Sequence, residues 1–152
     1  MAYKRPVSVL VVVHTPELEV LLLERTEPPG FWQSVTGSQE AGETLLETAV
    51  RELKEETGLD VAPGTLTNWG KQNEFEIFRR WRSRYAPGVT HNTEHVFSLQ
   101  VPRPVPVTLD PGEHTRYEWL PYRVAAERVF SWSNADALRE LPQRAQQAAQ
   151  KP

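Results

Sequence analysis

The chain of 152 residues contains no cysteine, so disulfide frameworks, thiolate nucleophiles and thiolate metal sites are excluded. Long hydrophobic runs are also missing: the apolar stretch Val7–Val13 is far shorter than the roughly 20 residues that a membrane-spanning helix needs. With a net charge of -3, the surface has no general excess of basic residues for binding nucleic acid. We therefore expect an enzyme-sized single domain with no nucleic-acid or membrane partner, compatible with a reducing cytoplasm.

The amino terminus resembles a signal peptide only superficially. Lys4 and Arg5 precede Val7–Val13, but seven residues is marginal for a hydrophobic region and no small-residue cleavage site follows. The stretch is short, rich in β-branched residues and bounded by Pro6 and Pro16. These features predict a buried strand.

The rest of the chain shows a mixed pattern of strands and helices without an internal repeat. Short apolar or alternating segments predict strands at Val20–Leu23, Trp32–Val35, Leu59–Val61, Glu74–Tyr85, His95–Val101, Val105–Leu109 and Tyr117–Leu120. The fourth and fifth of these are expected to pair as an antiparallel hairpin. Pro121 suits the first turn of one helix, and Ser133 with Asp136 indicates the start of another. Residues 1–140 are thus predicted to form one domain, followed by a frayed tail rich in Gln and Ala at 141–152.

One helix has clear signals at both ends. Thr44 and Glu47 have the spacing of a capping box, and Gly58 is a suitable terminator. Between them, an apolar stripe is expected to pack against the sheet, formed by Leu46, Ala49, Val50 and Leu53. An adjoining arc of the same helix is acidic.

The acidic arc consists of Glu52, Glu55 and Glu56. Like charges at these spacings disfavour an isolated helix, and three glutamates alone would usually form a solvated face. Gly37 and Gly42 before the helix instead favour a loop that folds tightly beneath a metal and phosphate site. Carboxylate oxygens suit Mg²⁺ or Mn²⁺, and Mg²⁺ usually takes one or two carboxylates together with waters and substrate phosphates.

A longer pattern includes this helix. The segment 37–59 fills every fixed position of G-x5-E-x7-R-E-U-x-E-E-x-G-U, where U is a bulky aliphatic residue. It resembles the Nudix box, the signature of hydrolases that cut diphosphate linkages. The resemblance implies an α/β fold, the α/β/α sandwich with a mixed central sheet. It also implies that Glu52 and Glu56 bind the metal and that Arg51 pairs with Glu43, whereas Glu55 could bind metal, support its ligands or orient the attacking water.

Strings outside the box narrow the expectation. YKRPVSVLVVV, FWQSVTGS, EFEIF, RYAPGVTHNTEH and SWSN resemble the branch of the family that hydrolyses dihydroneopterin triphosphate to the monophosphate and pyrophosphate in folate biosynthesis. The resemblance implies that Glu113 is a further metal ligand and candidate general base, with a solvated loop glutamate as the alternative. It implies that the substrate contacts Lys4, Arg25, Thr36, Phe75, Glu76, Ile77, Phe78 and Ser131. An arginine of residues 79–84 is a further candidate for binding the triphosphate. Sheet packing for the phenylalanines and helix capping for Ser131 are the structural alternatives.

Other functions remain open from the sequence. A pyrophosphohydrolase of nucleoside triphosphates would use the same metal with a different base pocket, and a non-catalytic sensor would bind a phosphorylated metabolite without cleaving it. The interleaved basic and aromatic residues of Phe78–Tyr85 suggest a nucleic-acid-binding module as a further alternative. His91, His95 and His114 do not have the spacing of a zinc site. The oligomeric state is not predicted.

Overall fold

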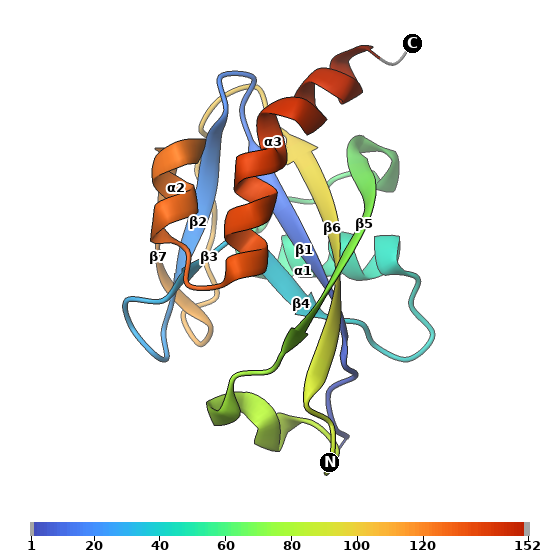
Figure 1. Cartoon of the computed structure of the whole chain (residues 1–152). Helices are drawn as coiled ribbons and strands as arrows, with labels where there is room; N and C mark the ends of the chain where they lie inside the picture. The colour runs from blue at the N-terminus through green and yellow to red at the C-terminus, as the bar shows by residue number, and fades with distance from the viewer. Residues whose placement is uncertain (1, 151–152) are drawn as a thin grey trace.

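The apolar amino-terminal stretch forms β1 (Val7–His14), a central strand in the computed structural model, which describes residues 2–150. Its sheet has seven strands in the order β3-β2-β1-β6-β5, with β4 paired to β1 and β7 paired to β2 (Figure 1). The other strands are β2 (Glu19–Arg25), β3 (Trp32–Gln33), β4 (Val35–Ser38), β5 (Leu66–Glu76), β6 (His91–Gln100) and β7 (His114–Pro121). Because β1 and β6 are parallel and all other pairs are antiparallel, the sheet is mixed, as predicted.

Both faces of β1 are buried, and alternate residues belong to different cores. Val9, Val11 and Val13 pack on the side of α1 (Leu45–Thr57). Leu10 and Val12 pack on the opposite side, beneath α2 (Tyr122–Arg128) and α3 (Trp132–Gln150). This alternation follows from the two-residue period of a strand. The predicted α/β/α sandwich is confirmed (Figure 1).

The predicted ends of α1 are confirmed by hydrogen bonds. The Thr44 hydroxyl accepts from the Glu47 N–H at 3.1 Å, and the Glu47 carboxylate accepts from the Thr44 N–H at 2.8 Å. At the other end Gly58 adopts φ of 77°, and its N–H donates to the Lys54 carbonyl. Glycine reaches this left-handed conformation without steric cost. The helix therefore starts and stops where local chemistry dictates.

The prediction of one long strand over Glu74–Tyr85 was wrong. β5 begins earlier and ends at Glu76, and Arg79–Arg84 forms a 3₁₀ helix, η2. Phe78 and Trp81 lie on the same side of this helix, because residues three apart eclipse each other in a 3₁₀ turn. Their rings are 5.3 Å apart at the centroids, and both pack against Phe130. The spacing of Phe78 and Trp81 therefore suits a 3₁₀ turn, in which both rings face Phe130.

Two further predicted strands, Leu59–Val61 and Val105–Leu109, are irregular segments. Their apolar side chains pack partly buried against the core beneath α1. The second segment is tied to the end of that helix, because the Thr108 N–H donates to the Thr57 carbonyl at 2.8 Å. Both segments have the apolar residues expected of a strand because they pack on the core, but neither pairs with a strand of the sheet. Trp32–Val35 is similarly divided between β3 and β4 at Ser34, whose N–H donates to the Asn134 side chain.

The segment from residue 141, predicted to be frayed, instead continues α3 to Gln150, while residues 151–152 lie outside the described part. Leu138 and Leu141 are fully buried against the sheet. Arg144 donates to the Trp69 carbonyl at 2.9 Å and to Glu140 at 2.8 Å. Packing of the apolar side of the helix therefore outweighs the polar composition. Pro121 caps α2 instead of standing in its first turn, and α3 begins one residue before Ser133.

Among residues 2–150, no helix combines the length and the hydrophobicity needed to cross a bilayer.

Candidate active site

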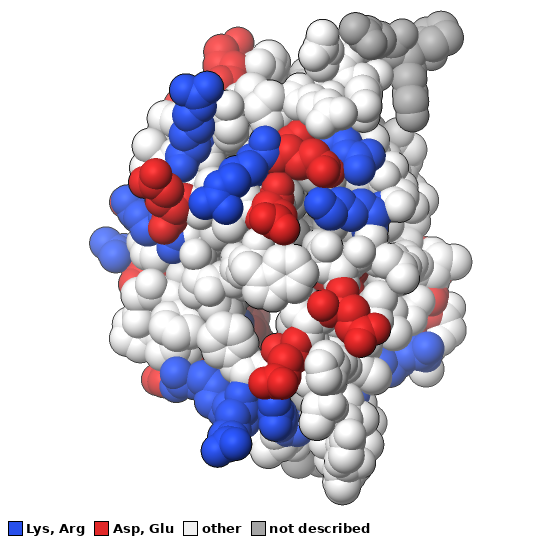
Figure 2. Space-filling view, in the orientation of Figure 1, with Lys and Arg blue, Asp and Glu red and all other residues white. Residues whose placement is uncertain are grey.

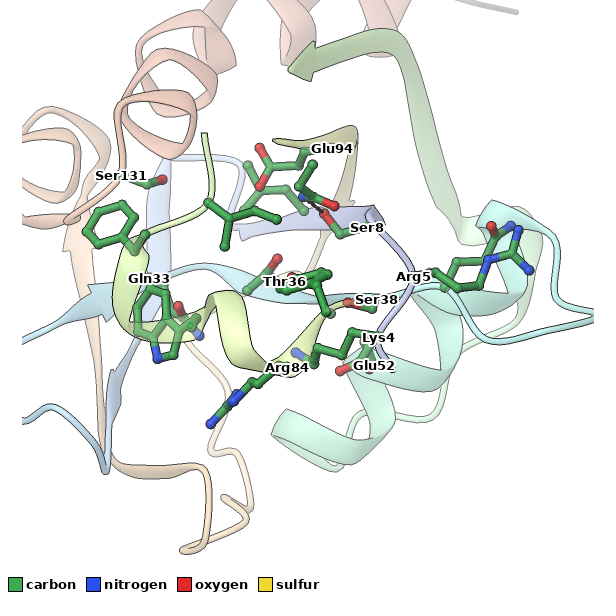
Figure 3. A pocket seen from close by; sticks show the side chains of 18 of the residues that line it. Lys4, Arg5, Ser8, Gln33, Thr36, Ser38, Glu52, Arg84, Glu94 and Ser131 are labelled. Carbon is green, nitrogen blue, oxygen red and sulfur yellow. Dashed lines mark hydrogen bonds between the residues drawn. The ribbon is translucent and has the colours of Figure 1, made fainter. Parts of the chain in front are cut away.

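A cleft of about 920 Å³ runs across the end of the sheet. Its walls come from the segment before β1, from β4, α1, the end of β5, η2, β6, the loop before β7 and the start of α3. The volume suits a small-molecule ligand. Figure 3 shows how side chains from these distant segments converge on it.

Two box glutamates lie at one end of the cleft with their carboxyl groups buried. Glu56 is only 7% exposed, and its Oε1 has no hydrogen-bond partner. Burial and the neighbouring Glu52 raise the pKa of Glu56 well above its usual range. The pKa of Glu52 is also raised, because its carboxyl is buried. Two adjacent acids are costly even though Arg51 bonds to Glu52, and a divalent cation would relieve that cost.

The backbone of β4 fits closely around these acids. A Cβ atom on Gly37 would lie 2.0 Å from Cδ of Glu52, so only glycine leaves room for that carboxylate. The backbone N–H of Thr36 bonds to Glu56 and opposes the rise of its pKa. The unpartnered Oε1 of Glu56 and the hard oxygen donors of both acids fit Mg²⁺ or Mn²⁺.

Arg51 connects the loop before α1 to these acids. Its Nε and Nη2 donate to Glu43 at 2.6 and 3.0 Å, and Nη2 also reaches the Ser38 carbonyl at 3.0 Å. Its Nη1 donates to Glu52 at 2.8 Å. These bonds lower the pKa of Glu43 to about 2 and raise that of Arg51. The pairing of Arg51 with Glu43 implied by the resemblance is confirmed.

The other two predicted catalytic acids are more exposed. The Glu55 side chain is 56% exposed and lies 3.3 Å from Nη1 of Arg51. Glu113 lies in the exposed loop before β7, across the cleft. Its negative charge contributes to the raised pKa of Glu56 and opposes the lowering of the pKa of Lys4. Within residues 2–150, no three Asp, Glu or His side chains form a preassembled metal-binding group, so Glu113 is not already grouped with Glu52 and Glu56.

Three cationic side chains line the same part of the cleft. Figure 3 shows Lys4 next to Glu52, with Arg84 close by. Burial and then the Arg84 charge lower the pKa of Lys4. Arg25 stacks over the Trp81 ring with its Cζ 4.6 Å from the centroid. Figure 2 shows the basic side chains gathered over η2, to which Arg84 belongs. The predicted Lys4 and Arg25 are thus brought together, with Arg84 from the 79–84 run.

The remaining predicted substrate residues all line the cleft. Ile77 is buried, and Phe78 is 40% exposed and packs against the rings of Trp81 and Phe130. Glu76 pairs with Arg82 at 3.1 Å, and Phe75 lies beside it on β5. Phe78 is therefore not a simple core residue.

Two predicted polar contacts also have structural roles. The Thr36 hydroxyl donates to the Val9 carbonyl at 2.8 Å. The Ser131 hydroxyl accepts from the Asn134 N–H at 3.2 Å, which is the capping role considered as its alternative. Both residues still face the cleft (Figure 3).

The sequence analysis missed a polar group at the other end of the cleft, formed by Ser8, Asn92, Glu94 and Ser133, all of which are buried. It also missed His114 as a cleft residue: burial lowers its pKa to about 4, and its Nε2 lies 2.9 Å from Nε2 of Gln33. A signal was present in β6, because Asn92 and Glu94 share the strand face of buried Val96.

The buried Glu56 with its neighbour Glu52, an arginine that ties Glu52 to a glycine-containing loop, and the nearby cations have the chemistry that a metal-bound polyphosphate requires. A sequence profile of the NUDIX domain matches residues 4–141. The chain belongs to the NUDIX family, and the hydrolase class predicted from its box is confirmed.

Comparison with individual members of the family gives more specific matches. The chain is 48% identical to the dihydroneopterin triphosphate diphosphatase of Escherichia coli K12 over 142 residues, which cover 91% of this chain and 93% of that protein. It is 42% identical to the Haemophilus influenzae protein of the same name, over 92% of this chain and 89% of that one. The solved structure of the E. coli dihydroneopterin triphosphate pyrophosphohydrolase superposes with a TM-score of 0.87, 47% identity and coverage of 92% and 97%.

Proposed function

We propose that the protein hydrolyses dihydroneopterin triphosphate to dihydroneopterin monophosphate and pyrophosphate, in folate biosynthesis in the cytoplasm. The observation that carries the proposal is the cleft that joins the buried Glu56 and the half-buried Glu52 to the cations Lys4, Arg25 and Arg84. The 48% identity to the E. coli diphosphatase over nearly the whole chain supports this choice of substrate.

Glu52 and Glu56 would hold Mg²⁺, with Mn²⁺ as a substitute, and Glu113 would complete the ligand set from the opposite loop. When bound, the ion supplies positive charge that stabilises the phosphate oxygens in the transition state and lowers the pKa of bound water. Arg51 keeps Glu52 in place through its bond at 2.8 Å, while Glu43 fixes the guanidinium from the other side.

The cations would bind the polyphosphate. Arg25 can donate two parallel N–H bonds to a phosphate, and its stacking on Trp81 restricts the guanidinium plane. Lys4 and Arg84 add charge beside it. With the chain of phosphates so held, the bond that breaks lies between the α and β phosphates. The water oxygen joins phosphorus, the bridging oxygen leaves with pyrophosphate or monophosphate, and a carboxylate takes the water proton.

Glu55 and Glu113 are the candidates for that carboxylate. Both line the cleft and are exposed, so neither is as strongly desolvated as Glu56. Glu56, which already faces Glu52, is better suited to hold the ion. Each of these two acids should be exchanged for glutamine in a separate variant, and kcat measured against pH. The variant that loses the rise of kcat with pH identifies the base.

A nucleoside triphosphate pyrophosphohydrolase is the second candidate, because the aromatic wall of Phe78, Trp81 and Phe130 can stack on any flat base. Pyrophosphate release in Mg²⁺ should be compared for dihydroneopterin triphosphate and the four common deoxynucleoside triphosphates. We expect kcat/KM at least tenfold higher for the pterin. Equal or better turnover of a nucleotide would overturn the assignment, and binding without any hydrolysis would indicate a sensor.

A further inference from the structure

Glu94 is a buried acid that the hydrolytic machinery does not use. It lies on β6, paired with Ser8 of β1 and with Asn73 of β5, and only 4% of its surface is exposed. Figure 3 shows its carboxyl group facing the cleft beside Ser8, away from Lys4 and Glu52. Its position is thus where the end of the substrate remote from the broken bond would lie.

The polar groups around Glu94 are incompletely bonded. Oε1 of Glu94, Oδ1 of Asn92 and the Ser133 hydroxyl are buried without a hydrogen-bond partner among the described residues. Asn92 is oriented by a 2.8 Å bond from its Nδ2 to the Ser8 hydroxyl, which leaves Oδ1 as the free acceptor. Unpartnered buried polar atoms are costly and rare in folded proteins, so several in one cleft indicate a ligand that completes them.

No cation neutralises this carboxyl. No salt bridge joins Glu94 within residues 2–150, and burial raises its pKa to about 7, opposed only by the nearby Ser133 hydroxyl, which does not reach hydrogen-bond geometry with the carboxyl. A ligand that completes Glu94 therefore has to bring hydrogen-bond donors. Phe75 near the end of β5, with Ile77 and Phe78 directly after the strand, gives the cleft an apolar side against which a flat ring can lie.

We propose that Glu94 is a specificity-determining residue that binds the 2-amino-4-oxopyrimidine edge of the substrate ring, accepting hydrogen bonds from its N3–H and 2-amino groups. Two adjacent N–H donors match the two oxygens of a carboxylate. Oδ1 of Asn92 is a further acceptor for the amino group, and the Ser133 hydroxyl is a donor for the 4-oxo oxygen. This inference rests on the proposed function only for the identity of the triphosphate, since guanine presents the same edge.

The first test uses neopterin, which carries the ring but no phosphate and requires no metal. Calorimetry should show binding to the wild-type protein and at least tenfold weaker binding to Glu94→Gln, because a neutral amide cannot accept both bonds. Glu74→Gln is the matched control, since Glu74 is exposed on β5 and does not line the cleft. It should bind neopterin like the wild type. Equal affinity of Glu94→Gln and wild type, with both folded by circular dichroism, would overturn the inference.

Kinetics provide the second test. For dihydroneopterin triphosphate, Glu94→Gln should raise KM at least tenfold and change kcat less than threefold, and inhibition by pyrophosphate should stay the same. A fall in kcat with unchanged KM would mean that Glu94 acts on the reacting end, against the proposal.

A pair of nucleotides separates this inference from the proposed function. dGTP has the 2-amino group and dITP lacks it, so the wild type should prefer dGTP by roughly tenfold in KM and Glu94→Gln should lose that preference. If the wild type fails on dihydroneopterin triphosphate but retains the dGTP preference, the proposed function fails and the role of Glu94 stands. If the wild type hydrolyses the pterin but Glu94→Gln changes neither KM nor neopterin binding, the proposed function stands and the role of Glu94 fails.

Discussion

The two ends of the cleft each contain a buried glutamate, but they are built differently. Glu56 lies beside Glu52 on the same helix, and Glu52 in turn bonds to Arg51 of that helix and fits against Gly37 in the strand before it. Glu94 is surrounded by residues from β1, β5 and α3, which are far apart in the chain. The acidic pair is therefore built locally, although the cations near it come from other segments, and the ring end depends on the whole fold.

The acids that support hydrolysis and the residues that select the ring therefore belong to different parts of the chain. A locally built acidic end can be retained while the strands and α3 change, so one hydrolytic device can serve different rings. The ring end of this chain can be altered without moving Arg51, because no hydrogen bond joins Glu94 to the box among residues 2–150. Substitutions at the two ends should therefore have separable effects.

The largest effect is expected from Glu56→Gln. Loss of one carboxylate from the buried pair should lower Mg²⁺-dependent pyrophosphate release by about 10³-fold, as removal of strong electrostatic stabilisation does. The folded protein should persist, because a neutral side chain replaces an acid whose pKa burial already raises. Steady-state assays and urea unfolding would check both, with Glu74→Gln as control. Activity within tenfold of wild type would contradict the metal role.

Gly37→Ala should lower turnover by about 10²-fold, because the new methyl group would lie 2.0 Å from Cδ of Glu52 and displace that carboxylate. The matched control is Gly64→Ala, since Gly64 has no atom within 4 Å of an added Cβ. The control should keep full activity. Neopterin binding should survive in both variants, and its loss in Gly37→Ala would mean that the two ends are coupled.

Glu94→Gln should stabilise the protein in alkaline solution while weakening ring binding. The pKa of Glu94 is about 7 in the folded state and 4.5 as its reference, so ionisation costs stability as pH rises from 4.5 through 7. Urea unfolding at pH 8 should show the variant more stable by roughly 1–3 kcal/mol, with the difference vanishing near pH 4.5. A pH-independent difference would show that Glu94 does not change its charge over this range.

The smallest effect is expected from Thr44→Ala, which removes the hydroxyl that accepts from the Glu47 N–H. Chemical denaturation should show a loss of about 1 kcal/mol, typical of a helix cap. Because the cap lies at the opposite end of α1 from Glu52 and Glu56, kcat should change less than twofold. A large fall in kcat would mean that the acidic end depends on the first turn of the helix.

The same contrast explains what could be predicted from the sequence. The start of α1 and its end at Gly58 depend on residues within one segment, so spacing was sufficient, whereas the Arg51–Glu43 pair was implied by the resemblance of the box. The pattern of short strands and helices predicted a mixed α/β fold, whereas the sandwich was implied by the resemblance of the box. These signals require no knowledge of distant segments.

The remaining features depend on long-range packing. η2 forms where Phe78 and Trp81 meet Phe130, a contact between residues far apart in sequence, and alternation alone suggested a strand. From the sequence, Glu94 resembles an ordinary polar residue of a strand, because its burial depends on the packing of α3, which is distant in the chain. The Gln- and Ala-rich end of α3 was predicted to fray because composition does not show that Leu141 is buried.

The parallel pairing of β1 with β6 has a consequence for how the molecule is made. Val7 lies opposite Thr93 and His14 opposite Gln100, so the middle of the sheet closes only after some hundred residues have been synthesised. Until then the valine-rich β1 lacks its neighbour and exposes an unpaired edge, which favours self-association. A growing chain that stops before β6 should therefore be prone to self-association, whereas one that extends past Gln100 can pair its central strand within its own sheet.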